Sequence, residues 1–292
     1  GPVCGRTPAM STYGRREVND NDDLNDDTGD VAYMDKILGG RYATYGEFPW
    51  MVAILYNDKQ MCGGAVIGEF WIITAAHCLF DGSQRYYKIA VGDHSMTYKD
   101  TNEETFELQT VIINERYRAR QYDFDIALAK IKPKSNGRGI QFNNYVQPIC
   151  LAESTDDARV GTKFVFSGWG WTSGSKNSFG RSPTLKKANL PFLAYDKCKR
   201  IYPRAISPNV LCAGNINGAE DLCSGDSGGP LALKVESSFV LYGIAAFSSG
   251  CQRPNYPTAF SSIAKYRGWI DSTIRRNSRG SEGTMPVRNV YF

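Results

Sequence analysis

The sequence predicts an all-β protein, built as a barrel or a sandwich. Short runs rich in β-branched and aromatic residues follow one another at close intervals, separated by turn-forming Gly, Pro, Asn and Asp. Helical periodicity is sparse and is confined to residues 194–202 and 263–276, the second with arginines in its last turn. The clearest strand candidates are residues 50–56, 65–73, 87–91, 106–113, 126–131, 163–167, 230–235 and 239–247.

Length and composition are those of a globular protein. A chain of 292 residues can bury a large core, and 42% hydrophobic with 22% charged residues is an ordinary balance. A net charge of +4 without a long basic run does not favour a nucleic-acid partner. No apolar stretch reaches the roughly 20 residues that span a bilayer, so no membrane partner is expected. The first residue is Gly1, with no initiator Met, which favours a processed chain.

The eight cysteines indicate disulfides. None lies in a C-x-x-C pair, and only two histidines are present, so a zinc site is not favoured. Disulfides form in oxidising compartments, and we therefore expect a secreted, extracellular protein.

The chain divides into three parts by composition and residue pattern. Residues 1–36 are polar, dense in aspartate and poor in large apolar side chains, which predicts a flexible linker. Cys4 is the exception in that segment, because it needs a partner elsewhere. Residues 37–277 carry the strand pattern of one folded domain, and residues 278–292 predict a disordered tail.

Ser227 lies in a glycine-rich run from residue 223 to residue 230. A serine hydroxyl attacks a carbonyl only when a base takes its proton and the resulting oxyanion is stabilised. Glycines allow a tight turn in which the N–H groups of Gly225 and Ser227 point into one small space. Such a run is more often a simple turn, so the interpretation depends on finding a base and an acid.

His77 and Asp125 are the candidates for base and acid. His77 ends a predicted strand beside small residues and a cysteine, although a histidine in such a place is often structural. Asp125 opens an apolar strand, where a half-buried carboxylate needs a partner such as an imidazole N–H. An aspartate that starts a strand can also be structural, and Asp123 fits that role better. The second histidine, His94, is expected in an exposed turn.

Together these residues resemble the chymotrypsin/trypsin family of serine proteases, in the order His, Asp, Ser. The resemblance extends from Ile37 to about Asn277, through segments 37–40, 48–50, 62–64, 74–78, 125–128, 168–170 and 223–230. It implies two six-stranded antiparallel β-barrels with a C-terminal helix. His77 and Asp125 would lie on the first barrel and Ser227 on the second.

The resemblance also implies roles. Ser227 attacks the scissile carbonyl, His77 takes its proton and returns it to the leaving amine, and Asp125 fixes the imidazole tautomer. The N–H groups of Gly225 and Ser227 form the oxyanion hole, each worth about 3–4 kcal/mol. This chemistry requires no cofactor. The implied partners are protein or peptide substrates and serpin-type inhibitors, and the implied state is a monomer.

The segment from Lys36 to Gly40 resembles the family's zymogen activation junction. Cleavage after Lys36, by an upstream protease or by the protein itself, would free the Ile37 ammonium to pair with Asp226. The uncleaved chain is thus expected to be a zymogen that acts by limited proteolysis in a proteolytic cascade. The Cys-Gly before the junction is similar to the linker of arthropod clip-domain proteases.

Family position also implies the disulfide pairing. The expected pairs within the protease domain are Cys62–Cys78, Cys198–Cys212 and Cys223–Cys251. The remaining pair, Cys4–Cys150, would keep residues 1–36 attached after cleavage.

Two further expectations concern the substrate. Asp221 matches the base of a trypsin-like pocket, where a carboxylate selects Lys or Arg. Leu222, Ser248 and Thr258 narrow this pocket and are similar to elastase walls, which admit small residues. Ala246 replaces the serine that usually supports the catalytic aspartate. The alternatives are therefore elastase-like specificity, or a weakly active or non-catalytic homologue that serves as a cofactor or binding partner.

The loop from Asp93 to Glu104 resembles the calcium loop of trypsin-like enzymes. Its carboxylates, which include Asp100 and Glu103, suit that ion. A plain acidic surface loop is the alternative.

Overall fold

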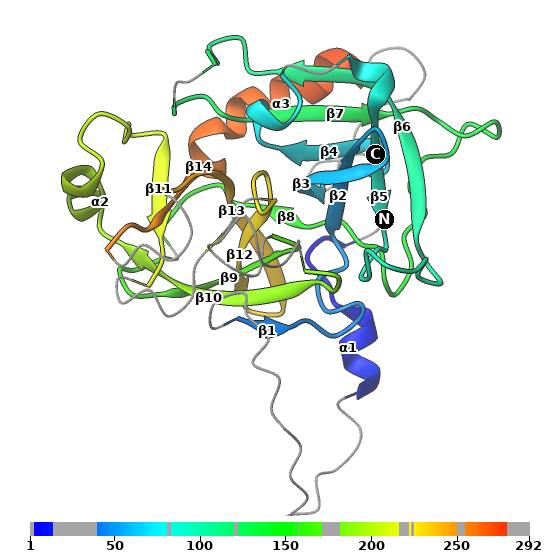
Figure 1. The fold of residues 1–292 in the computed structure, drawn as a ribbon, viewed down its shortest axis with the longest axis horizontal. Helices are drawn as coiled ribbons and strands as arrows, with labels where there is room; N and C mark the ends of the chain where they lie inside the picture. Colours follow the sequence, from blue (N-terminus) through cyan, green and yellow to red (C-terminus); the bar gives the residue numbers. More distant parts are fainter. Residues whose placement is uncertain are drawn as a thin grey trace, which may run out of the picture.

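The computed structural model describes residues 3–13, 40–80, 83–119, 122–156, 158–170, 182–215, 222, 225–249 and 255–278. Within them the strands form two antiparallel barrels that lie next to each other, with helix α3 (Ile263–Ser278) crossing the first (Figure 1). The predicted fold class is confirmed.

The first barrel closes in the order β2-β3-β4-β7-β6-β5. The hairpin between β2 and β3 turns at Asn57 and Asp58, whose φ angles of 49° and 61° are those favoured in tight two-residue hairpins. The strands are β2 (Met51–Tyr56), β3 (Lys59–Val66), β4 (Trp71–Thr74), β5 (Tyr87–Val91), β6 (Glu104–Ile113) and β7 (Ala127–Ile131).

The second barrel runs in the order β10-β11-β14-β13-β12-β9, and pairing of β9 with β10 closes it. Two further short strands pair with strands of this barrel: β1 is antiparallel to β10, and β8 is parallel to β13. The strands are β1 (Arg41–Tyr42), β8 (Cys150–Leu151), β9 (Lys163–Gly168), β10 (Lys186–Leu193), β11 (Val210–Ala213), β12 (Pro230–Val235), β13 (Ser238–Phe247) and β14 (Thr258–Ser262).

One predicted strand, residues 65–73, is two strands in the structure. A tight turn at Gly68 separates them, closed by the Ile67 N–H donating to the Trp71 carbonyl at 3.0 Å. Strand β10 was not predicted, because Lys186 and Pro191 interrupt its apolar pattern. Lys186 is nonetheless only 1% exposed.

Both predicted helices form, as α2 (Tyr195–Ile201) and α3. Helix α3 packs against β13, β14 and β8 and buries the apolar residues Ile263, Tyr266, Ile270 and Ile274, whose spacing places them on one face. Among the described residues, no helix has the length and apolar character needed to cross a bilayer.

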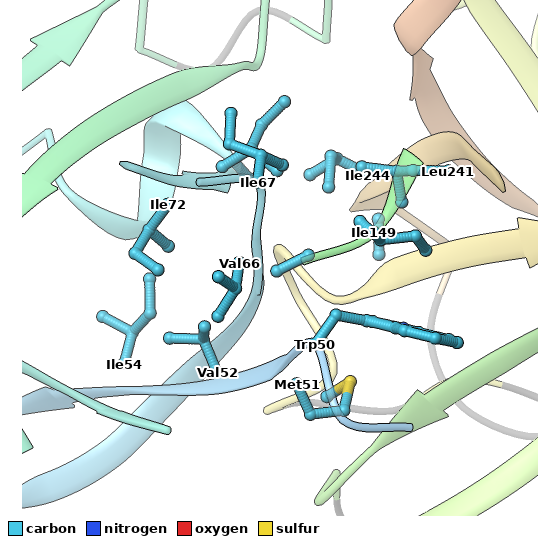
Figure 2. Close-up of a cluster of buried hydrophobic side chains, with 14 of the residues drawn as sticks. Trp50, Met51, Val52, Ile54, Val66, Ile67, Ile72, Ile149, Leu241 and Ile244 are labelled. Carbon is cyan, nitrogen blue, oxygen red and sulfur yellow. The ribbon is translucent and has the colours of Figure 1, made fainter. Parts of the chain in front are cut away.

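A single hydrophobic core joins the two barrels. Figure 2 shows Val52 and Ile54 of β2 near Val66 and Ile72 in the first barrel, while Leu241 and Ile244 come from the second. Trp50 lies in the same cluster and is fully buried. The relative placement of the barrels, on which any site between them depends, is therefore set by continuous apolar packing.

The amino-terminal residues are joined to the second barrel. The Cys4–Cys150 disulfide is present, and Gly5 forms backbone hydrogen bonds with Pro148 and Phe239, both 2.8 Å long. A short helix, α1 (Pro8–Tyr13), follows and was not predicted. Residues 14–39 and the tail from residue 279 lie outside the described residues.

Two more predicted disulfides, Cys62–Cys78 and Cys198–Cys212, are also present. The predicted Cys223–Cys251 pair lies outside the described residues.

Candidate active site

His77 lies in a 3-10 turn, Ala76–Cys78, directly after β4. Ala75 and Ala76 are fully buried, so the segment packs close to the barrel wall. The Cys62–Cys78 disulfide fixes the adjacent residue to β3. The backbone of His77 is therefore held on both sides, while its side chain remains 34% exposed.

Asp125 follows a constrained turn. Phe124 has a φ of 57°, which is uncommon for a bulky residue. Asp123 stabilises this turn by accepting hydrogen bonds from the Phe124 N–H at 2.8 Å and the Tyr266 hydroxyl at 3.0 Å. Burial, followed by the charge of Asp123, raises the pKa of Tyr266, so its hydroxyl stays protonated. Asp123 thus has the structural role expected of it, and the turn directs Asp125 inward.

The two side chains form a closely bonded pair. Asp125 is 4% exposed, and its Oδ2 lies 2.7 Å from His77 Nδ1 while its Oδ1 accepts the His77 backbone N–H at 2.9 Å. Burial lowers the pKa of His77, but the hydrogen bond and the charge of Asp125 outweigh it and leave the pKa raised. The carboxylate assigns the proton to Nδ1 of the neutral imidazole, which leaves Nε2 as the basic atom.

The loop that carries Ser227 is attached to the first barrel close to His77. The Gly63 N–H donates to the Ser227 carbonyl at 2.8 Å. Gly228 has a φ of 78° and approaches Thr74 so closely that a Cβ there would lie 2.3 Å from the Thr74 hydroxyl oxygen. Thr74 ends β4, three residues before His77. The structure thus holds the loop that carries Ser227 against the segment of the first barrel that carries His77, the partner of Asp125.

Beside Ser227 lies a small cavity of about 30 Å³. The Thr258 hydroxyl is buried without a hydrogen-bond partner among the described residues. Asp221 lies outside those residues, and the lining comprises Leu222, Asp226, Ser227, Ala245, Ala246, Phe247, Ser248 and Thr258.

Asp226, next to the serine, is 2% exposed. Its Oδ1 accepts the Gly170 N–H at 2.8 Å, so the carboxylate faces the segment that follows β9. Lys36 and Ile37 lie outside the described residues, and the pairing of Ile37 with Asp226 stays a prediction.

One supporting residue was missed by sequence reasoning. The Ser261 hydroxyl on β14 donates to the Asp125 backbone carbonyl at 2.7 Å. It joins the second barrel to the segment that holds the acid, whereas the nearby Ala246 has no hydroxyl to offer. Its position in an apolar strand could have indicated this role, because a buried serine hydroxyl needs a hydrogen-bond partner.

The predicted calcium loop brings three carboxylates together. Oxygens of Asp93, Asp100 and Glu103 lie within 4.8 Å of one another. Asp93 Oδ1 is buried without a partner among the described residues. Burial and the charges of Glu103 and Asp100 raise the pKa of Asp93 to about 7. His94, predicted to be exposed, is half-buried here, and its N–H donates to Asp100.

Comparison with known proteins identifies relatives of this chain. A family model described as Trypsin matches residues 37–270. A protein of Canis lupus familiaris named "Hepatocyte growth factor activator serine proteases" is 35% identical over 251 residues, which cover 85% of this chain and 38% of that protein. A protein of Halocynthia roretzi named "Ovochymase" is 37% identical over 252 residues, 80% of this chain and 15% of that protein.

The chain therefore spans well under half the length of these two relatives. Neither supports the predicted link to arthropod clip-domain proteases. The family match spans strands of both barrels and the positions of His77, Asp125 and Ser227. This chain belongs to the trypsin family of serine proteases.

Proposed function

We propose that this chain is the precursor of a secreted serine endopeptidase. The observation that carries the proposal is the 2.7 Å contact between His77 Nδ1 and Asp125 Oδ2, beside Thr74 and Cys78, against which the Ser227 loop packs. Three disulfides support an extracellular location. The partners we propose are protein substrates, an upstream activating protease and serpin-type inhibitors of the monomeric enzyme.

The geometry supports acyl transfer through Ser227. His77 Nε2 takes the hydroxyl proton as the oxygen attacks the scissile carbonyl, and the imidazolium then protonates the leaving amine. The buried Asp125 carboxylate stabilises that imidazolium. The N–H groups of Gly225 and Ser227 bind the oxyanion, and water completes hydrolysis of the acyl-enzyme by the same proton transfers.

Activation follows cleavage between Lys36 and Ile37. The Asp226 carboxylate is buried and lies beside Ser227, which makes it the acceptor that we propose for the new ammonium. The activated enzyme then performs limited proteolysis, since the pocket walls restrict which side chains enter.

Two specificities compete at that pocket. Asp221 favours Lys or Arg, whereas Leu222, Ser248 and Thr258 narrow the walls and favour a small side chain. We expect a peptide-library profile to show no turnover by the uncleaved chain and selective turnover by the Lys36-cleaved chain. Preference for Lys or Arg would show that Asp221 forms the base of the pocket. Preference for small apolar residues would show that Leu222, Ser248 and Thr258 determine the specificity.

The same profile tests the alternative of a non-catalytic homologue. If the cleaved chain turns over no peptide and its Ser227 does not react with a fluorophosphonate, the endopeptidase proposal is wrong. A Lys36→Gln variant serves as the matched control, because it changes only the lysine at the proposed cleavage site and so prevents cleavage there.

We also propose a calcium site at Asp93, Asp100 and Glu103. The three carboxylates fit a divalent cation that takes oxygen ligands, and the buried Asp93 Oδ1, which has no hydrogen-bond partner in the part of the chain that the structure describes, supports this fit. Bound calcium would stabilise the loop by compensating carboxylates that repel one another. The proposed hydrolysis does not depend on it.

Calcium is expected to raise the melting temperature of the protein by about 5 °C or more at a hundred times its Kd. Asp93 has a pKa of about 7 in the fold against an ordinary value of 3.8, so its ionisation destabilises the fold as pH rises through that interval. The calcium effect should therefore be larger above pH 7 than below it. Calorimetry with and without calcium at both pH values measures the difference.

Asp93→Asn should abolish the calcium effect, while the control Glu107→Gln, an exposed carboxylate paired with Lys132, should retain it. An equal calcium effect in both variants would rule out this site.

A further inference from the structure

Gln60 is a polar residue inside the otherwise apolar wall of β3. It is 8% exposed, and its Nε2 donates to two backbone carbonyls, that of Cys62 at 3.1 Å and that of Gly225 at 3.2 Å. Both partners are acceptors only, which fixes the orientation of the amide. The side chain thus bridges the first barrel and the loop that carries Ser227.

The second of these bonds acts on a particular peptide unit. The Gly225 carbonyl belongs to the Gly225–Asp226 peptide, and the Gly225 N–H is one Cα away. Gly225 has a φ of 100°, where rotation about its backbone bonds is little restricted by sterics. A hydrogen bond that holds this carbonyl therefore limits the directions in which the Gly225 N–H can point.

Strand β3 holds the same loop at a second place. Three residues beyond Gln60, the Gly63 N–H donates to the Ser227 carbonyl at 2.8 Å. The carbonyl of Gly63 in turn accepts the Thr74 hydroxyl at 2.8 Å. Among the described residues, backbone thus holds the Ser227 carbonyl and the Gln60 side chain holds the Gly225 carbonyl.

We infer that Gln60 is a positioning residue for the oxyanion hole, acting through the Gly225 carbonyl. This inference rests on the proposed function for its catalytic consequence. Its structural consequence, an ordered Gly225–Asp226 peptide, is independent of whether the protein hydrolyses peptides. Gln60 itself is not placed to touch the substrate in this role.

The test compares Gln60→Met, which keeps the length and loses both donors, with Gln60→Glu, whose carboxylate places an acceptor against two carbonyls. Gln84→Met is the matched control, because Gln84 Nε2 also bridges two carbonyls, those of Leu108 and Gln109, at 2.9 and 2.7 Å. Two measurements are made on each protein: amide hydrogen exchange of the segment around residues 225–229, and kcat and KM of the Lys36-cleaved form.

Gln60→Met should speed exchange in that segment and lower kcat by about tenfold to a hundredfold, less than the 10²–10³ lost when an oxyanion donor itself is deleted. KM and the acid limb of the pH profile should stay unchanged, and affinity for a peptide boronate should fall in parallel with kcat. The kcat of Gln60→Glu should fall further than that of Gln60→Met. Gln84→Met should change none of these.

The outcomes distinguish the positioning role of Gln60 from the proposed endopeptidase activity. Faster exchange in Gln60→Met while every protein, wild type included, is inactive would support the positioning role and contradict the endopeptidase. Wild-type exchange in Gln60→Met would overturn the positioning role, whatever the activity. An active Gln60→Met enzyme with unchanged kcat and unchanged boronate affinity would overturn its catalytic consequence.

Discussion

Ser227→Ala is expected to lower kcat of the Lys36-cleaved protein by about a millionfold, since loss of a triad nucleophile leaves only binding and oxyanion stabilisation. Ser227 is half-buried, and the loop that carries it packs at Gly228 against Thr74 and Cys78, on either side of His77 in the sequence, so we propose its hydroxyl as the nucleophile. Labelling by a fluorophosphonate, read by mass spectrometry of the modified peptide, should disappear together with peptide hydrolysis.

The matched control is Ser272→Ala on helix α3, where the hydroxyl donates to the Trp269 carbonyl. This variant should label and hydrolyse as the wild type does. Retained labelling in Ser227→Ala would show that another residue is the nucleophile and would contradict the proposed mechanism.

Asp125→Asn is expected to lower kcat by about four orders of magnitude, the loss found when a triad aspartate becomes an amide that stabilises the wrong tautomer. The pH profile should also move. In the wild type, the hydrogen bond and charge of Asp125 raise the pKa of His77 against the effect of burial. Without them burial remains, so the pKa falls and the acid limb of kcat/KM shifts to lower pH.

Asp271→Asn is the control for this change of charge. Asp271 pairs with Arg267 four residues away on α3, at 3.0 Å, and its side chain is 33% exposed. We expect unchanged kinetics and less than about 1 kcal/mol of lost stability. An acid limb that stays in place in Asp125→Asn would mean that His77 is not the titrating base.

The sequence predicted the first barrel better than the second, for a physical reason. Strands such as β2 and β5 are short apolar runs between turns, and their pattern is visible locally. Strand β10 contains Lys186, Lys187 and Pro191, and its residues pair with three strands, β9, β11 and, far back in the sequence, β1. Such a strand is specified by its neighbours in the fold more than by its own residues.

At the candidate site, the residue types and order were sufficient to select His77, Asp125 and Ser227. What could not be predicted are side chains that act on backbone groups far away in sequence. Gln60 donates to a carbonyl 165 residues further on, and Ser261 to one 136 residues earlier. No local pattern encodes either contact, because each depends on how the two barrels pack.

The Cys4–Cys150 disulfide determines whether the two products of the proposed activation cleavage stay together. It joins residues 146 positions apart, on opposite sides of the Lys36–Ile37 bond. Cleavage there yields two polypeptides that remain covalently linked, so the product migrates as one species on a non-reducing gel and as two on a reducing gel. Any protein bound to the amino-terminal polypeptide would also stay with the enzyme, so the proposed activation would release no diffusing protease domain from that complex.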